Sequence, residues 1–205
     1  MEVRVGTSVR DRAANILQEV IDERGPSPET CGLYGRIYKD WYDEACSRGQ
    51  QEIASVYLDQ TIEWYRRGFE ADPRDYYPGI NLATLLFVKG TPEALEELRR
   101  VVPVVSFAAA RRGGMGSDDY WDVATVLEAA VLGEDWDHAK RAAAKAATLG
   151  SPGWMRETTV RNLWMIRTVR EARGMSTEEI DSVLTILLQD GEDTTFRPWE
   201  NANRR

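Results

Sequence analysis

Apolar residues recur every three to four positions in this chain, and proline or glycine interrupts them about every twenty residues. One such run steps by four, three and four along a single helix face: Leu58, Ile62, Tyr65 and Phe69. Pro73 ends that run, because proline disfavours helical geometry in the residue before it. Alternating β-branched runs are nearly absent, and the short apolar run 101–105 contains Pro103, which fits a strand poorly. The pattern therefore predicts an all-α chain.

The helix boundaries follow from the same proline and glycine residues and from capping residues beside them. Thr91-Pro92-Glu93, for example, places an N-cap residue, a proline and an acid in the order that a helix start favours. We expect about nine helices with short connections, covering approximately residues 11–23, 27–41, 58–69, 79–88, 91–112, 117–133, 136–149, 154–173 and 177–189.

Small and apolar residues recur at offsets that are typical of tetratricopeptide repeats. Residues 34–38 match the L-G-x-x-Y core of a first helix. Second helices show the matching offsets at Thr61, Tyr65, Gly68 and Pro73, at Ala94, Leu98 and Val101, and at Ala139, Ala143 and Ala146. The sequence predicts a right-handed α-solenoid of about four divergent tetratricopeptide-like helix pairs plus an extra helix. Residues 1–189 are expected to form one domain, and residues 190–205 an irregular C-terminal tail.

Composition excludes several classes of function. The chain has 26 Lys and Arg against 34 Asp and Glu, a net charge of −8, which argues against a nucleic-acid partner. His138 is the only histidine, so multi-histidine zinc sites are ruled out, and it has no nearby Ser or Cys partner. Acidic pairs such as Asp118-Asp119 stand at expected helix starts, where they balance the helix dipole. We therefore expect no catalytic residues, no metal site and no cofactor.

The two cysteines and the lack of long apolar segments indicate the cellular compartment of the protein. Cys31 and Cys46 on one helix would lie about 22 Å apart, too far for a disulfide, and unpaired thiols favour a reducing compartment. No apolar run is long enough for a membrane span or a signal peptide. The sequence predicts a cytoplasmic protein with no membrane partner.

Residues 31–40, CGLYGRIYKD, resemble the CGRIYKD segment of apoptosis signal-regulating MAP kinase kinase kinases. The segment belongs to their central regulatory region, also called the TRAF-binding domain. The likeness continues in the same order through residues 62–70, 79–86, 97–100, 111–113 and 120–123. It implies tetratricopeptide repeats that bind partner proteins and prime a kinase, although this chain carries no kinase motif. Related bacterial sensor domains have been proposed to bind a nucleotide-derived ligand, and the Ala/Arg-rich composition is typical of bacterial proteins.

The resemblance leaves two functions open. We predict a non-catalytic protein-interaction scaffold of a stress or immune signalling system; the alternative is a sensor of a small anionic nucleotide- or NAD-derived ligand. Seven side chains are candidates for binding on the concave face: Arg36, Lys39, Asn81, Arg99, Arg111, Tyr120 and Trp121. Arginines there can hold carboxylates or phosphates, and aromatic rings can cover a base or a peptide.

Structural roles compete with these assignments. Arg36 and Arg99 could brace the stack by pairing with Asp40, Glu63 or Asp122. The glycine-rich segment 113–116 is expected to be an inter-helix loop; a phosphate cradle is the alternative. Five tryptophans are expected to pack between helices: Trp41, Trp64, Trp136, Trp154 and Trp164.

Overall fold

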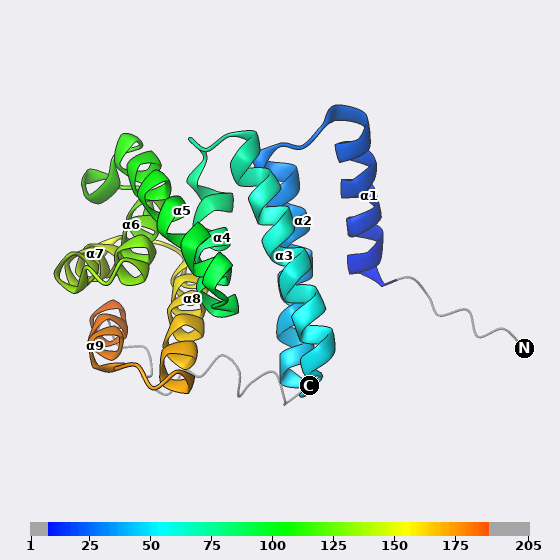
Figure 1. Cartoon of the computed structure of the whole chain (residues 1–205). Helices are drawn as coiled ribbons and strands as arrows, with labels where there is room; N and C mark the ends of the chain where they lie inside the picture. The colour runs from blue at the N-terminus through cyan, green and yellow to red at the C-terminus, as the bar shows by residue number, and fades with distance from the viewer. Residues whose placement is uncertain (1–7, 189–205) are drawn as a thin grey trace, which may run out of the picture. The chain divides into compact units, whose positions relative to one another are not determined.

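A computed structural model describes residues 8–188, and within that range the chain forms nine α-helices and no strand (Figure 1). The helices are α1 (Val9–Arg24), α2 (Pro28–Ser47), α3 (Gln51–Ala71), α4 (Tyr76–Lys89), α5 (Pro92–Arg111), α6 (Tyr120–Leu132), α7 (Trp136–Thr148), α8 (Gly153–Ala172) and α9 (Glu178–Leu187). The all-α prediction is confirmed for the described residues. Residues 101–105 lie inside α5, where Pro103 sits on the exposed side.

The helices pack in sequential pairs: α2 with α3, α4 with α5, α6 with α7, and α8 with α9, while α1 packs on α2. They fall into two compact units, one that ends at Asp72 and one that begins at Pro73, and each is described by itself. The right-handed solenoid and the single domain over residues 1–189 stay predictions. The expected tail, residues 190–205, lies outside the described residues.

In the first unit, α2 and α3 approach closely because α2 carries a glycine where they meet. A Cβ on Gly35 would lie 3.1 Å from the Tyr65 ring, and Tyr65 is fully buried. Thr61 and Gly68, the other small positions predicted on α3, are buried as well. Cys31 and Cys46 both lie on α2 as free thiols, as predicted. The small residues thus mark the interface between the paired helices.

In the second unit, α4 and α6 form the core. Nearly every residue of these two helices is buried. The α7 helix can lie close to α6 because its inner face consists of alanines, and Ala139, Ala142, Ala143 and Ala146 are completely buried. Predicted positions Ala94, Leu98 and Val101 form part of the buried face of α5. The short segment Gly114–Gly116 is a 3₁₀ turn between α5 and α6, which agrees with the inter-helix loop.

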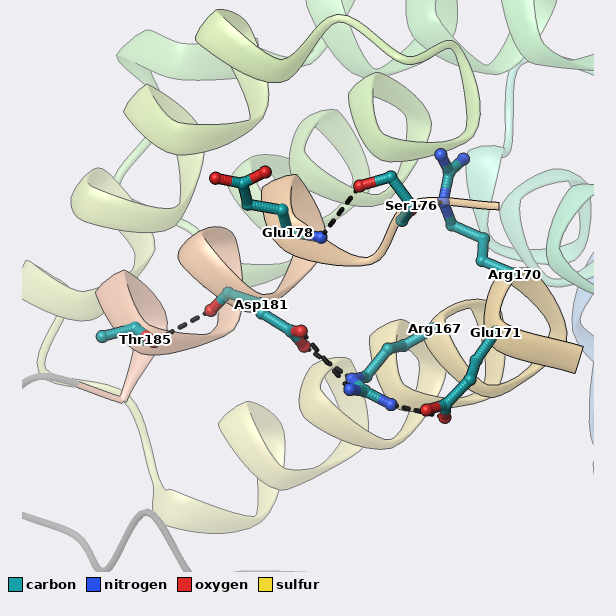
Figure 2. Close-up of polar contacts among 7 residues, drawn as sticks. All are labelled: Arg167, Arg170, Glu171, Ser176, Glu178, Asp181 and Thr185. Carbon is teal, nitrogen blue, oxygen red and sulfur yellow. Dashed lines mark hydrogen bonds and ion pairs between the residues drawn. The ribbon is translucent and has the colours of Figure 1, made fainter. Parts of the chain in front are cut away.

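Arginines on α8 hold α9 in place, as Figure 2 shows. Arg167 donates to the Asp181 carboxylate on α9 through Nη2, at 3.3 Å, and to Glu171 on its own helix through Nη1, at 2.9 Å. Arg170 is buried, donates from Nε to the Ser176 carbonyl at 2.9 Å, and forms an ion pair with Glu134. The turn between α8 and α9 is therefore fixed by charged hydrogen bonds.

The end of α4 provides a first testable prediction. Gly90 ends α4 with a φ of 65°, and a Cβ there would lie 1.8 Å from Nη2 of Arg173. That guanidinium donates to the Phe87 and Val88 carbonyls at 2.9 and 3.0 Å. Gly90→Ala should therefore lower the free energy of unfolding by about 2–3 kcal/mol, through backbone strain and loss of these bonds.

Gly174 provides the matched control for this measurement. Its φ is 69°, yet a Cβ there would meet no atom within 4 Å. Gly174→Ala should cost the backbone strain alone, about 1–2 kcal/mol. Urea denaturation of both variants separates the two contributions. Equal losses in the two variants would mean that the Arg173 contact contributes nothing.

Candidate functional site

The two candidate residues of the first unit lie on α2. Arg36 is half-exposed, and its Nε lies 3.2 Å from Oδ1 of Asp40, one helical turn away. Lys39 is buried. Asp40 is one of the acids with which Arg36 was expected to brace the stack. This ion pair, however, joins two residues of the same helix and does not link α2 to another helix. Glu63, the other acid considered in this unit, pairs with Arg66 and Arg67.

Three candidates of the second unit lie on α4 and α5. Asn81 is buried, and its side-chain amide donates to the Tyr77 carbonyl at 3.0 Å. Arg99 is exposed and donates to Glu96 on the same helix at 2.8 Å. Arg111 is exposed in the last turn of α5, and no ion pair joins it to any of residues 8–188. Arg111 is thus the candidate cation most open to a partner.

Tyr120 is buried at the start of α6. Its hydroxyl donates to Thr159 Oγ1 on α8 at 3.1 Å, and Asn162 on α8 donates to the buried Glu128 of α6 at 3.0 Å. Burial raises the pKa of Tyr120 to about 12. This ring therefore ties α6 to α8 and offers no face for stacking.

The raised pKa of Tyr120 predicts a loss of stability in alkali. An unfolded tyrosine loses its proton near pH 10, whereas folded Tyr120 keeps it until about pH 12. The unfolded state therefore binds fewer protons in this window, and the contribution of Tyr120 is complete below pH 10 and lost as pH rises through 12. The free energy of unfolding should fall by up to about 1 kcal/mol per pH unit through this group.

Denaturation of wild type and Tyr120→Phe at pH 8, 10 and 11 measures this effect. The variant should start less stable and decline more shallowly, because it lacks the titrating hydroxyl. A decline as steep as that of wild type would show that Tyr120 does not contribute to the pH dependence.

Trp121 and Trp154 form an aromatic pair, which we call the tryptophan pair. Trp121 lies in the first turn of α6 and is half-buried, and Trp154 lies in the first turn of α8. Their ring centroids are 5.8 Å apart, and Trp154 is 57% exposed. The prediction that Trp154 packs between helices is wrong. Thr159 is the first buried residue of α8, and Trp154 comes before it in the chain. The first turn of α8 therefore extends beyond the core.

The other four tryptophans that were expected to pack between helices are more enclosed than Trp154. Trp64 is buried, and Trp41, Trp136 and Trp164 are half-buried. Trp64 stacks on Tyr34 at a centroid distance of 4.2 Å, and Trp136 lies beneath the Arg170 guanidinium. The packing role is confirmed for Trp64, and Trp154 is the exposed tryptophan among residues 8–188.

Charges of both signs belong to the elements that carry the tryptophan pair. Arg156 on α8 lies close enough to Tyr120 to lower its pKa against the larger effect of burial. Its buried Nε has no hydrogen-bond partner among the residues that the structure describes. Asp119 caps α6 by accepting from the Trp121 amide at 2.8 Å, and the exposed Asp118 lies 3.8 Å from Lys145. The first turns of α6 and α8 thus carry an aromatic pair with charged residues of both signs on the same two elements.

Asp122, beside the tryptophan pair, has a structural role. Its buried carboxylate accepts from the Tyr76 hydroxyl at 2.6 Å and from Ser117 Oγ at 2.7 Å. Arg112 Nε lies 3.5 Å from the same carboxylate. Asp122 therefore joins α4, α6 and the loop between α5 and α6. Its partner is Arg112, so the predicted bracing by Arg36 or Arg99 does not occur at this acid.

Comparison with known proteins decides the family. The family model of the MAP3K TRAFs-binding domain matches residues 3–185. The chain belongs to this family. The resemblance predicted from residues 31–40 and the segments that follow is therefore confirmed.

Similar proteins include mitogen-activated protein kinase kinase kinases of animals. This TRAFs-binding domain is 36% identical to nsy-1 of Caenorhabditis elegans over 172 residues, covering 77% of the chain and 11% of that kinase. It is 35% identical over 172 residues to kinase kinase kinase 15 of Mus musculus, covering 82% of the chain and 12% of that relative. For kinase kinase kinase 5 of Homo sapiens, identity is 28% over 157 residues. The chain thus spans about a tenth of the length of these relatives.

Residues 8–188 of this TRAFs-binding domain contain no cluster of three His, Cys, Asp or Glu side chains that could hold a metal ion. His138 Nδ1 lies 3.8 Å from Oδ2 of Asp135, the residue that caps α7. Within the same range, none of the helices combines the length and the apolar character needed to cross a membrane.

Proposed function

We propose that this TRAFs-binding domain is a non-catalytic interaction module of a cytoplasmic stress-signalling assembly, and that its partner is a TRAF-family protein. The observation that carries the proposal is the match of residues 3–185 to the family named MAP3K TRAFs-binding domain. The match describes a binding domain, and the similar kinases extend far beyond the region shared with this chain.

We place the contact at the tryptophan pair. Tryptophan and arginine are among the residue types that contribute most to protein–protein affinity, because they combine a large apolar area with a hydrogen-bond donor. Trp154 is 57% exposed, and a partner that covers its large apolar ring removes the cost of that contact with water.

The alternative, a sensor of a small anionic ligand, has less support. Of the predicted cations, Arg36 and Arg99 pair with acids of their own helices, and Lys39 is buried. Arg111 alone in that set is an exposed cation without an ion pair in residues 8–188. A small dianionic ligand ordinarily requires several convergent donors.

Calorimetric titration of the full chain with purified TRAF proteins tests the proposal. We expect saturable binding to at least one of them. A thermal-shift panel of nucleotides and NAD metabolites tests the alternative, since a ligand at 100 times its Kd adds about 2.7 kcal/mol to stability. A clear shift with one metabolite, and no binding to any TRAF protein, would contradict the proposed function.

A further inference from the structure

The first helix, α1, packs on an aromatic surface of the first unit, and Figure 1 shows it alongside α2. Tyr34 of α2 and Trp64 of α3 are buried in one cluster with residues of α1, and Tyr38 and Trp41 pack against it half-buried. We call these four rings the aromatic face. The Arg67 guanidinium lies 4.7 Å from the Trp64 ring. Large rings beside an arginine have the composition of strong protein–protein contacts.

α1 contributes little of the packing in this cluster. Of its sixteen residues only Ala14 and Ile21 are buried, and Leu17 is half-buried, whereas α2 and α3 bury six residues each. An exposed ion pair, Arg10 with Glu44 at 2.8 Å, links α1 to the last turn of α2, and exposed pairs add little stability. Separation therefore disrupts less packing for α1 than for either of the other two helices.

The connection between α1 and α2 leaves each helix complete in itself. Gly25 ends α1 with a φ of 80°, and its amide donates to the Ile21 carbonyl at 2.8 Å. Ser27 and Thr30 form a reciprocal capping box that begins α2. A Cβ on Gly25 would meet no atom within 4 Å, so nothing packs against this turn. The connection can therefore change direction without unravelling either helix.

We infer that α1 is a displaceable cover, which separates from α2 and α3 as one helix and exposes the aromatic face to an amphipathic helix of another protein. The docking helix repeats the apolar stripe of α1, a small residue followed by larger apolar ones three and seven positions later, as in Ala14, Leu17 and Ile21. Opening of a single helix is a common local fluctuation of folded proteins. The inference rests on the proposed function in treating the chain as an interaction module, and it assigns a surface of the first unit.

Cys31 reports this opening in the full chain. It is completely buried in the cluster that α1 closes, and burial raises the pKa of its thiol. Cys46 on the same helix is exposed and provides an internal reference. Iodoacetamide labelling followed by mass spectrometry measures both rates. Labelling of Cys31 should be slow and change less than about twofold between 0 and 1 M urea, because one helix exposes little surface; unfolding of the whole unit would change it about fivefold or more.

Two matched deletions of one methylene locate the opening. Ile21→Val should speed labelling of Cys31 at least threefold. Ile62→Val, the same deletion at a buried position of α3 that is not part of this cluster, should leave the rate unchanged. Equal acceleration in the two variants, or the steep urea dependence, would mean that Cys31 is exposed only when the whole unit unfolds. Either result overturns the inference.

A labelled peptide of residues 8–25 tests the docking step. Ile21→Asp in the full chain should release α1, so the peptide should bind this variant at least tenfold more tightly than wild type, whose own helix competes. Fluorescence anisotropy measures the affinity. A peptide with aspartate in place of both Leu17 and Ile21 should bind neither protein. If Ile21→Asp fails to fold by circular dichroism, Ile21→Val takes its place, with at least threefold tighter binding expected. Binding to neither form at about 1 mM, or equally to both, would make the inference wrong.

The outcomes remain separate from those of the proposed function. If TRAF binding is observed and the labelling and peptide tests fail, the inference falls and the proposed function stands. If no TRAF protein binds, the labelling rates and the peptide affinities still decide whether α1 is a displaceable cover.

Discussion

Replacing Asp122 by alanine is expected to lower the free energy of unfolding by about 2–4 kcal/mol. The buried carboxylate accepts from Tyr76 and Ser117 and faces Arg112, so its removal leaves buried donors without a partner. Burial and the bond to Asp122 also raise the pKa of Tyr76, which shows how strongly the two groups are coupled. Urea denaturation followed by circular dichroism measures the change.

Asp118 is the matched control for Asp122. It precedes the same helix, but its side chain is 98% exposed. Asp118→Ala should change the free energy of unfolding by less than about 0.5 kcal/mol. If Asp122→Ala is as stable as Asp118→Ala, the three-way junction of α4, α6 and the loop does not contribute to stability as described.

Replacing Trp154 by alanine is expected to weaken TRAF binding by ten- to a hundredfold while leaving the fold intact. The ring is exposed and contacts Trp121, so truncation removes little buried area from the domain but a large anchor from the interface. Calorimetry gives the change in Kd, and thermal denaturation gives the change in stability.

Met175→Ala controls for loss of an exposed apolar side chain elsewhere in the second unit, since Met175 is also partly exposed. Its affinity for the TRAF protein should equal that of wild type. Wild-type affinity in Trp154→Ala would remove the tryptophan pair from the interface, and equal losses in both variants would make the effect nonspecific.

The sequence predicted the helices well wherever a helix buries one face. The alanines of α7 and the Gly35–Tyr65 contact correspond to predicted repeat positions. The first two turns of α3 were missed, because Ala54 is the only buried residue before Thr61. Pro103 counted against a strand at residues 101–105, and the helix predicted over residues 91–112 is confirmed as α5, with the proline inside it.

The site could be predicted only in part, because periodicity does not reveal whether a polar side chain finds its partner inside the fold. Asn81 and Tyr120 bond to groups of their own unit. Trp121 was identified, whereas Trp154 was assigned to the core because tryptophan usually packs there. Bacterial origin stays a prediction, and so does the concave-face assignment of Arg36, Lys39, Asn81 and Arg111.

Hydrogen–deuterium exchange of the full chain, alone and with a TRAF protein at saturation, tests the central claim most directly. The tryptophan pair lies at the starts of α6 and α8, so a partner that covers it must slow exchange there. We predict protection confined to peptides containing residues 118–124 and 151–157. Binding that leaves exchange at 118–124 and 151–157 unchanged would contradict the account.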